Sequence, residues 1–358
     1  MPTIAIQDDH IIRVLSVVLD PDCPQERADA FADYYSVDMP EFPDWCELIR
    51  ERYPEVYPSK VLLAKSEDEL RGMLAEADLA VVEDYPVGEA ELAAAPKLKF
   101  VQVFRADARN VDAEACARRG IGTAPLYRRV NRAVAEHAFA LLMTLAKKIT
   151  ETNKLLTLEA LHAKGWPARA YDRRHTANSN WARISGILNL RGSTIGIVGL
   201  GSIGRDVAKW ANAFEMTVLY TQRHRLSEAL EAEFGARYTS LDELLAQSDA
   251  ISIHVPLSDR TRGMIGAAQL ARMKEGAILV NVSRADIVDR DALLEAMRSG
   301  RLGGLGMDVH YEEPGRPDDE LFAFDNVALS PHTAIGTRVN GAGDVEEMVA
   351  NLARAMKG

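Results

Sequence analysis

Short runs of Val, Ile and Leu alternate with helical patterns along almost the whole chain. The runs lack strict apolar–polar alternation, which predicts parallel strands covered by helices on both faces. The stretches between them, such as 240–249 and 290–300, carry apolar residues at i, i+3 and i+4, with Ser or Asp near their starts. Repeated strand–helix–strand units of this kind predict a doubly wound α/β architecture.

The predicted strands fall into two groups, because they are too many for one tidy sheet. The first group is VLSVVLD (14–20), VLLAK (61–65), LAVVED (79–84), KFVQVF (99–104) and GIGTAP (120–125). The second group is STIGIVGLG (193–201), TVLYT (217–221), AISIHVPL (250–257), AILVNVS (277–283), GLGMDV (304–309) and NVALSPH (326–332). Two parallel sheets, and hence two domains, are expected.

One long helical pattern separates the two groups. Residues 131–156 are rich in Ala and Leu, and we expect a single helix that supports a subunit or domain interface or, alternatively, packs within one domain. The polar segment 162–192 that follows is too long for a plain connector, which favours a functional or interface role. Trp181 in this segment could reach a partner subunit or simply pack within the loop.

The composition is that of an acidic globular protein. Of 358 residues, 47% are hydrophobic and 27% are charged, and the formal net charge is −11. This charge argues against a nucleic-acid or membrane surface, so a bound anion has to meet a local basic cluster. Cys23, Cys46 and Cys116 share no metal-ligand spacing, and we expect free thiols and no metal. Without a leader or an apolar run of about 20 residues, the chain is expected to be cytoplasmic.

A glycine-rich turn stands between a predicted strand and a predicted helix. Gly199, Gly201 and Gly204 form GxGxxG. The first glycine permits a tight turn, the second lets a pyrophosphate approach the main chain, and the third lets helix and strand pack closely. The helix N-terminus then offers free N–H groups to the anion. We therefore predict dinucleotide binding here, with Ser202 and Ile203 contributing to the same turn.

The residues from Thr221 onward, at the end of the next predicted strand, indicate which dinucleotide is bound. An acid that holds the ribose 2′-hydroxyl of NAD is expected there, but Gln222 occupies the place, flanked by Arg223 and Arg225. A carboxylate would repel a 2′-phosphate, whereas a guanidinium binds it. The stretch therefore predicts a preference for NADP(H), with NAD(H) possible; the alternative is that the arginines belong to a solvated loop.

The ordered motifs GLGSIG, HVPLSDRTRGMIG, NVSRADIVDRDALLEAMRSGRLGGLGMDV, EEP and SPHTAIGT resemble the D-isomer-specific 2-hydroxyacid dehydrogenase family, from about Phe100 onward. The run 220–238 is similar to that of its NADPH-preferring glyoxylate and hydroxypyruvate reductases. The resemblance implies that His332 is the proton donor, Glu313 its carboxylate partner and Arg284 the residue that binds the substrate carboxylate. These roles suit the chemistry, because reduction of a 2-oxo acid needs a hydride at C2 and a proton on the carbonyl oxygen.

Further roles follow from the same resemblance. Asp308 matches a contact to the nicotinamide amide, Val255 and Pro256 match residues that line its ring, and Thr261 belongs to the same cofactor-binding run. His254 is interpreted as structural. The family also implies a homodimer and a small 2-oxo or 2-hydroxy acid as substrate.

The predicted substrate loop departs from the family pattern G-x-G-x-D-N-x-D. This chain has RADARNVD, with Arg105 and Asp107 at the two glycine positions, Ala106 between them and Arg109 at the place of the first acid. One interpretation is a cationic pocket for a second acidic group on the substrate, to which the nearby arginines 128 and 129 add charge. The other is that these arginines pair with Asp107, Asp112 or Glu136 and do not touch substrate.

We therefore predict a Rossmann cofactor domain, residues 132–331, inserted into a flavodoxin-like substrate domain, residues 1–131 with 332–358 returning to it. The expected active site lies in the cleft between them. The predicted activity is NADPH-dependent reduction of a 2-oxo acid to a D-2-hydroxy acid. The alternative is a non-catalytic, dinucleotide-sensing protein on the same fold, like the corepressors of this family; the complete Arg–Glu–His set argues against it.

Overall fold

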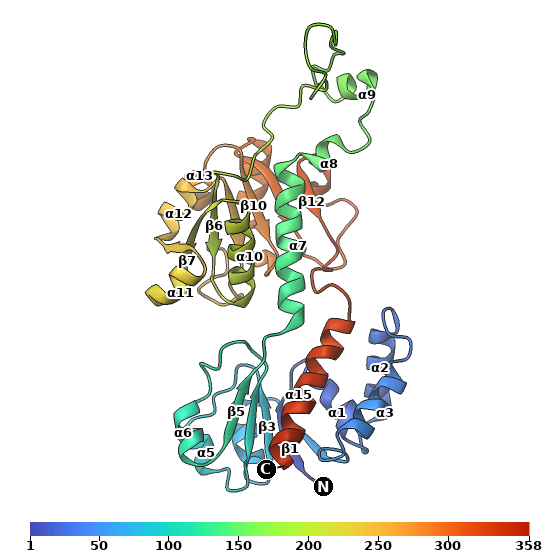
Figure 1. Cartoon of the computed structure of the whole chain (residues 1–358), viewed down its shortest axis with the longest axis vertical. Helices are drawn as coiled ribbons and strands as arrows, with labels where there is room; N and C mark the ends of the chain where they lie inside the picture. The colour runs from blue at the N-terminus through green and yellow to red at the C-terminus, as the bar shows by residue number, and fades with distance from the viewer. Residues whose placement is uncertain (358) are drawn as a thin grey trace. The chain divides into compact units, whose positions relative to one another are not determined.

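The computed structural model describes residues 1–357, and the chain divides into two compact units (Figure 1). Unit 1 comprises Met1–Asn131 and Ile335–Gly358, and unit 2 comprises Arg132–Ala334. Residues 332–334, which we expected in the substrate domain, therefore belong to unit 2. The reason is local: Asp308 accepts hydrogen bonds from the main-chain N–H groups of Thr333 and Ala334.

Unit 1 contains a five-stranded parallel sheet in the order β2-β1-β3-β4-β5, which is the flavodoxin-like order. Its strands are β1 (Thr3–Gln7), β2 (Lys60–Ala64), β3 (Leu79–Val82), β4 (Phe100–Val103) and β5 (Gly122–Pro125). Its helices are α1 (Val14–Leu19), α2 (Gln25–Ser36), α3 (Phe42–Arg52), α4 (Glu67–Met73), α5 (Glu89–Ala93), α6 (Ala113–Arg118) and α15 (Val339–Lys357), with α7 beginning at its boundary.

Both faces of this sheet are covered, as the continuous apolar runs predict. Ile4 and Ile6 of β1 pack into a core with α1, α3 and α15, whereas Ala5 packs into the opposite core with α4 and α6. Successive residues of a strand point to opposite faces, so one short strand supports both cores. The C-terminal helix α15 lies against β4 and α1, which returns the end of the chain to the first unit (Figure 1).

Unit 2 contains a seven-stranded parallel sheet in the order β12-β11-β10-β9-β6-β7-β8, a Rossmann order extended by one strand. Its strands are β6 (Thr194–Val198), β7 (Thr217–Thr221), β8 (Ala236–Tyr238), β9 (Ala250–Ile253), β10 (Ala277–Asn281), β11 (Leu302–Met307) and β12 (Val327–Leu329). Its helices are α7 (Arg129–Ala146), α8 (Ile149–Thr152), α9 (Leu158–Ala163), α10 (Ser202–Ala213), α11 (Glu228–Glu233), α12 (Leu241–Gln247), α13 (Ala267–Arg272), α14 (Arg290–Arg298) and the 3-10 turns Ala285–Ile287 and Glu320–Ala323.

The second sheet is also covered on both faces. Helices α7 and α10 pack on one face, and α12, α13 and α14 pack on the other. The predicted fold class, two doubly wound parallel-sheet domains, is therefore confirmed. None of the helices among residues 1–357 is both long and apolar enough to cross a membrane.

One predicted strand is wrong, and two strands were not predicted. Residues 14–19 form the buried helix α1 instead of a strand, because a short, fully buried apolar run has no periodicity that separates the two. The runs at 3–7 and 236–238 were not predicted and form β1 and β8. The edge strand β8 is only three residues long, too short to show a pattern.

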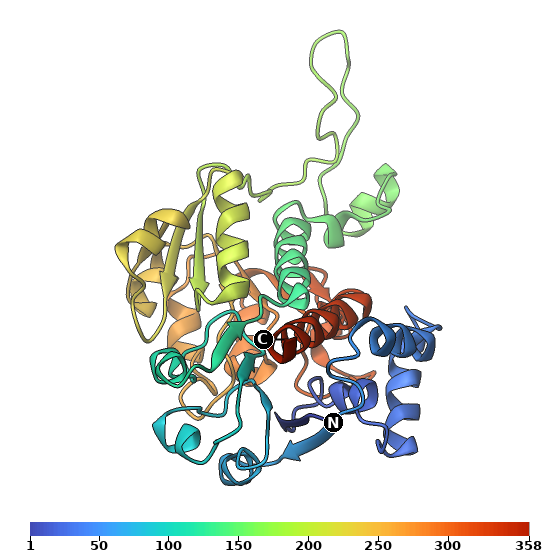
Figure 2. The same cartoon turned by 60° about the horizontal axis from the view of Figure 1, so that its bottom comes forward.

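The helix predicted over residues 131–156 is also wrong, because the helix in the structure ends earlier. The helix α7 ends at Ala146, and Lys148 adopts φ 54°, in the left-handed region, before the single turn α8. No glycine marks this break, so the sequence did not signal it. The segment that follows includes the short helix α9 and a long irregular loop, and it extends away from the sheet of unit 2 (Figures 1 and 2).

Candidate active site

The predicted functional residues of unit 2 follow the carboxyl ends of its parallel strands. The glycine turn follows β6, Gln222 follows β7, the run 254–261 follows β9 and Arg284 follows β10. Glu313 lies in the segment after β11, and His332 lies after β12. Because these strands are parallel, their carboxyl ends share one edge of the sheet, where ligands of doubly wound proteins bind.

The glycine turn has the close contacts that a dinucleotide cradle requires. Gly199 has φ +97°, and a Cβ there would lie 2.8 Å from the carbonyl oxygen of His254. A Cβ on Gly204 would lie 2.3 Å from the carbonyl oxygen of Gly199, so only glycine allows α10 to start this close to β6. At Gly201, by contrast, an added Cβ would meet nothing within 4 Å, which leaves space beside the main chain at the start of α10. These residues fit a bound pyrophosphate.

The end of β7 is held by side-chain hydrogen bonds. Gln222 Oε1 accepts a hydrogen bond from Leu200 N–H at 3.1 Å, and its Nε2 donates to the carbonyl oxygen of His224 at 2.6 Å. Arg223 is exposed, and its Nε donates to His224 Nε2 at 2.9 Å. The loop thus presents a neutral amide and a cationic side chain where an NAD-binding protein would carry an acid.

Arg225 has a different environment from Arg223. Its Nε and Nη2 donate to the two carboxylate oxygens of Glu231, at 2.9 and 2.7 Å. These bonds and one from the Tyr220 hydroxyl lower the pKa of Glu231 to about 2. The sequence grouped the two arginines together, but the structure gives Arg225 a bidentate carboxylate partner and leaves Arg223 beside a histidine.

The run after β9 is ordered by Thr261, whose hydroxyl donates to the carbonyl oxygen of Pro256 at 2.7 Å and accepts from Ser258 N–H at 2.8 Å. His254 Nε2 lies 2.8 Å from the Ser252 hydroxyl, and desolvation lowers the pKa of His254, so its ring stays neutral. These contacts are within the unit and fit the structural interpretation of His254. The predicted contacts of Val255, Pro256 and Thr261 with a nicotinamide ring remain predictions.

Arg284 is exposed at the start of a 3-10 turn, just past the buried Asn281. The Asn281 side chain fixes this turn: its Nδ2 donates to the carbonyl oxygen of Arg284 at 2.9 Å, and its Oδ1 accepts from Ser283 N–H at 3.0 Å. Arg284 Nη1 donates to the carbonyl oxygen of Ser283, and no carboxylate among residues 1–357 forms an ion pair with the guanidinium. A substrate carboxylate could therefore bind it without displacing an acid.

Glu313 and His332 form the predicted pair. His332 Nδ1 lies 2.7 Å from Glu313 Oε2, and Glu313 Oε1 accepts from His310 N–H at 2.8 Å. Burial alone would raise the pKa of Glu313, but these two hydrogen bonds outweigh it and the net pKa is lowered. An ionised Glu313 thus orients the ring through Nδ1 and leaves Nε2 to exchange a proton, the arrangement of a general acid with its orienting carboxylate.

The loop that carries His332 is anchored by Asp308, a role that the sequence did not predict. Asp308 is 1% exposed, and it accepts hydrogen bonds from the Ser330 hydroxyl at 2.6 Å and from the N–H groups of Thr333 and Ala334 at 2.8 Å each. His137 Nε2 contacts the same Ser330 hydroxyl at 2.7 Å. Asp308 was predicted to contact a nicotinamide amide; the structure adds that both of its oxygens hold the His332 loop. His332 itself has φ 55°, so it depends on this anchoring.

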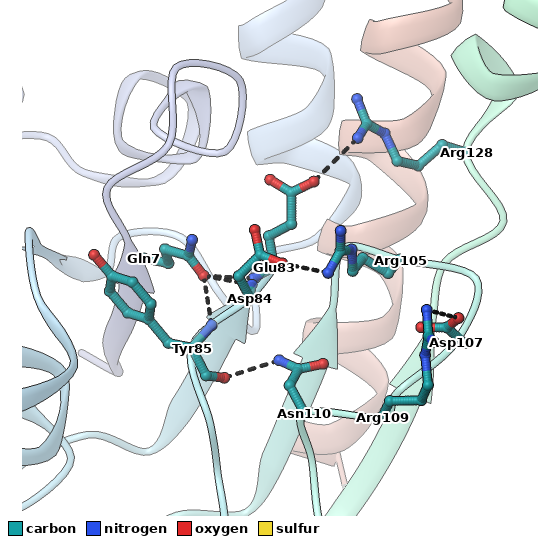
Figure 3. Close-up of polar contacts among 9 residues, drawn as sticks. All are labelled: Gln7, Glu83, Asp84, Tyr85, Arg105, Asp107, Arg109, Asn110 and Arg128. Atoms are coloured by element: carbon teal, nitrogen blue, oxygen red, sulfur yellow. Dashed lines mark hydrogen bonds and ion pairs between the residues drawn. The ribbon is translucent and has the colours of Figure 1, made fainter. Parts of the chain in front are cut away.

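The predicted substrate loop lies in unit 1, after β4, and is tied to the loop after β3 (Figure 3). Arg105 forms an ion pair with Asp84, and Arg109 pairs with Asp107 at 2.8 Å. The Asn110 side chain donates to the carbonyl oxygen of Tyr85 at 2.8 Å, which joins the two loops. Of the predicted local partners, Asp107 is found; Asp112 instead caps α6, and Asp84 was not foreseen.

These arginine pairs are partly exposed and weak. The side chain of Arg105 is 39% exposed and that of Arg109 is 77% exposed. Exposed ion pairs stabilise a protein by only about 0–1 kcal/mol. The pairs therefore favour the interpretation that both arginines are held locally, without preventing either from contacting an anion.

Comparison with known proteins places the chain in a family. Residues 139–334 match the family model described as D-isomer specific 2-hydroxyacid dehydrogenase, NAD binding domain. A glyoxylate reductase of Korarchaeum cryptofilum is 36% identical over 274 residues, covering 76% of this chain and 77% of the relative. A glyoxylate reductase of Thermococcus litoralis is 36% identical over 306 residues, covering 85% and 86%.

A solved structure agrees with these sequence matches. The D-lactate dehydrogenase of Aquifex aeolicus, complexed with NAD and lactic acid, has a TM-score of 0.53 and 28% identity, covering 98% of this chain and 94% of that one. The resemblance read from the ordered motifs is confirmed. The chain belongs to the D-isomer specific 2-hydroxyacid dehydrogenase family and is a nicotinamide-dinucleotide-dependent oxidoreductase of that family.

Proposed function

We propose that the protein reduces a 2-oxo acid to a D-2-hydroxy acid with NADPH as the preferred cofactor. The observation that carries this proposal is the hydrogen-bonded pair of Glu313 and His332, on the same edge of the unit 2 sheet as the glycine turn and Arg284. The matched relatives named glyoxylate reductase support the direction of the reaction. The bound cofactor supplies the hydride.

Protein side chains bind the substrate and donate the proton in the proposed reaction. Arg284 binds the substrate carboxylate through its guanidinium fork and polarises the carbonyl group. His332, with Nδ1 held by Glu313, donates a proton from Nε2 to the carbonyl oxygen as the hydroxyl forms.

A turnover assay tests this proposal. The protein is mixed with NADPH and glyoxylate, and the loss of absorbance of the reduced nicotinamide is followed, with chiral analysis of the product from a longer 2-oxo acid. Steady reduction to the D-isomer is expected. Binding of NADPH without reduction of any 2-oxo acid would favour the alternative, a dinucleotide-sensing protein on the same fold.

We also propose that the protein acts as a homodimer through the segment 147–190, here called the arm. The arm exposes apolar side chains: Leu156 is 78% exposed, Ile149 51%, Ile187 42% and Leu158 40%. Several exposed apolar side chains in one segment support an interaction role for that segment. Trp181 is half-buried within the arm, where its carbonyl oxygen accepts from Arg169 N–H at 2.9 Å, which fits packing inside the loop.

Light scattering coupled to gel filtration should give twice the chain mass of 39.4 kDa. Leu156→Asp should shift the mass toward a single chain, because a carboxylate replaces apolar surface that the second copy would cover. Val37→Asp is the matched control, since Val37 is 72% exposed in unit 1, outside the arm. A wild-type protein that elutes as one chain at all concentrations contradicts the proposal.

A further inference from the structure

His310 contacts both segments that carry the candidate proton-transfer pair, Glu313 and His332. It is half-buried in the segment after β11, three residues before Glu313. Its main-chain N–H donates to Glu313 Oε1 at 2.8 Å, and its side-chain Nε2 lies 2.8 Å from the carbonyl oxygen of Ser330. Ser330 precedes His332 by two residues, so His310 connects the carboxylate of the pair to the segment of the histidine.

The protonated atom of the His310 imidazole follows from its partner. A carbonyl oxygen only accepts hydrogen bonds, so Nε2 of His310 carries a hydrogen and donates it to Ser330. The same carbonyl oxygen accepts from the main-chain N–H of His332 at 2.9 Å. A carbonyl oxygen has two lone pairs, and these two donors occupy both. The side chain of His310 is thus bonded to the atom that also holds the main chain of His332.

Together these contacts form a closed hydrogen-bond cycle of Glu313, His310, Ser330 and His332. Glu313 accepts from His310 N–H, and the His310 imidazole donates to Ser330. Ser330 also accepts from His332 N–H, and His332 Nδ1 lies 2.7 Å from Glu313 Oε2, which closes the cycle. A member of a closed cycle cannot shift without distorting two hydrogen bonds. The orientation of the His332 imidazole toward Glu313 is therefore fixed from two directions.

Ser330 is itself held in place and gives the cycle a fixed point. Its hydroxyl lies 2.6 Å from Asp308 Oδ1 and 2.7 Å from His137 Nε2. The single hydrogen of the hydroxyl goes to the carboxylate, so the hydroxyl oxygen accepts from His137. The main-chain N–H of Ser330 donates to the carbonyl oxygen of Met307 at 3.0 Å. The carbonyl group that His310 contacts is thus part of a residue with both its side chain and its main chain bonded.

The backbone conformation of His332 requires support from both sides. Its φ is 55°, in the left-handed region that residues with a Cβ rarely adopt. Such a conformation persists only where the surrounding structure fixes it. Asp308 fixes the residues after His332, because it accepts from the N–H groups of Thr333 and Ala334. On the other side of His332, the contact between His310 and Ser330 is the corresponding support.

We propose that His310 is a positioning residue for proton transfer, because its imidazole closes the hydrogen-bond cycle that orients His332 toward Glu313. In this role it acts through these two residues and exchanges no proton with the substrate itself. The inference rests on the proposed function, since the orientation of His332 affects turnover only where His332 donates the proton.

Two substitutions at position 310 separate the hydrogen bond from the volume of the side chain. His310→Leu keeps an apolar side chain without a donor, whereas the amide of His310→Gln can still donate to the Ser330 carbonyl oxygen. The main-chain N–H that bonds to Glu313 is present in both. We expect His310→Leu to lower kcat for glyoxylate reduction by about tenfold to a hundredfold, because small errors in the placement of a reacting group have effects of this size. His310→Gln should recover most of the loss, and binding of NADPH should be the same in both variants.

The substitution His310→Leu in a second background tests whether His310 acts through His332. In His332→Ala the cycle is already open, and no imidazole remains to be oriented. His310→Leu should therefore lower the residual kcat of that variant by less than about twofold. A residue that only supports the fold would lower kcat by the same factor in both backgrounds.

Ser193→Ala is the matched control for the loss of one side-chain hydrogen bond to a main-chain carbonyl group. The Ser193 hydroxyl donates to the carbonyl oxygen of Leu190 at 2.7 Å. Ser193 directly precedes β6, at the edge of the sheet opposite the candidate site. Its removal should leave kcat unchanged, and thermal unfolding of both variants measures what each lost hydrogen bond costs the fold.

A further variant keeps the test valid where His310→Leu does not fold. His310→Asn retains a polar amide but is one methylene group shorter than His310→Gln, so its donor lies nearer the main chain and away from Ser330. It should show the same loss of kcat as His310→Leu, and the same dependence on His332.

The outcomes distinguish this inference from the proposed function. Reduction of glyoxylate that His310→Leu and His310→Asn leave unchanged, or that His310→Gln lowers as much as they do, overturns the positioning role and leaves the proposed function standing. An equal factor of loss in the wild-type and His332→Ala backgrounds has the same consequence. Reduction of no 2-oxo acid by the wild-type protein removes the proposed function, and the positioning role with it.

Discussion

Replacing His332 by alanine should lower kcat for 2-oxo acid reduction by a factor on the order of 10²–10⁴, the usual contribution of a positioned general acid. The physical reason is that the alkoxide formed by hydride addition needs a proton, and His332 is oriented by its hydrogen bond to Glu313 at 2.7 Å. Steady-state kinetics at saturating NADPH measures the effect.

The matched control for this substitution is His175→Ala. That histidine is 76% exposed and lies outside the runs that follow the strands of unit 2. Its removal should leave kcat unchanged where light scattering gives wild type and variant the same mass. Binding of NADPH, followed by quenching of protein fluorescence, should be retained in both variants. A loss of less than about tenfold in His332→Ala would show that another group donates the proton.

Glu313→Gln should move the alkaline limb of the pH–rate profile for reduction to lower pH. Because the pKa of Glu313 is lowered in the folded protein, its carboxylate stays negative above that pKa and loses its charge only as the pH falls through it. Across the neutral range the wild-type protein thus has a negative charge beside His332, and the amide removes it. A negative charge stabilises the protonated form of a neighbouring general acid, which is the physical reason for the expected direction.

The size of this pH shift is bounded by the exposure of the pair. The side chains of His332 and Glu313 are 45% and 38% exposed, so solvent screens their interaction. Exposed ion pairs contribute only about 0.2–1 kcal/mol, so the shift of the limb should be small. Profiles whose limbs coincide for wild type and Glu313→Gln would remove Glu313 from the proton-transfer pair.

The candidate residues of the unit 2 site were named from the family resemblance, and several of them occur in short runs that follow buried strands. Parallel strands place such runs on one edge whatever the details of packing. What the sequence could not show is which side chains hold the catalytic ones. Asp308 anchors the His332 loop and the His310 N–H holds Glu313, and neither contact leaves a pattern in the spacing of residues.

In unit 1 the prediction was weaker because the partners of the loop arginines come from distant segments. Asp84 pairs with Arg105 across 21 positions, and Glu83 contacts Arg128 across 45. The strand at 3–7 was missed although its alternate residues pack into two cores. Residues 14–19 were taken for a strand because a fully buried run shows neither helical nor strand periodicity.

For the cofactor, kcat/KM with NADPH should exceed that with NADH by at least about tenfold. A charge-assisted hydrogen bond to the 2′-phosphate is expected to contribute about 1.5–3 kcal/mol, or about 10- to 150-fold in affinity. No acid follows β7 directly; the neutral Gln222 is fixed there by Leu200 N–H, so a 2′-phosphate meets no opposing charge from that side chain.

The structure separates the two arginines that the sequence grouped together. Arg223→Ala should raise KM for NADPH by about tenfold or more and leave the kinetics with NADH nearly unchanged. Arg225→Ala should have a smaller effect, because Arg225 already donates two hydrogen bonds to Glu231 and would have to share or lose them to bind a phosphate. Equal use of NADPH and NADH by the intact enzyme would refute the preference itself.

A variant designed to reverse the preference for NADPH over NADH gives the sharpest test of the same site. Gln222→Glu keeps a side-chain oxygen that can accept from Leu200 N–H and adds a negative charge at the strand end. That charge should repel the 2′-phosphate and can accept a hydrogen bond from a ribose 2′-hydroxyl, so the preference should move toward NADH. The double variant Gln222→Glu with Arg223→Ala should reverse the ratio of kcat/KM for NADPH to kcat/KM for NADH. The double variant Gln222→Glu with Arg225→Ala should change this ratio less. If both combinations shift the ratio equally, the bond between Arg225 and Glu231 does not withhold Arg225 from the cofactor, and the two arginines act together.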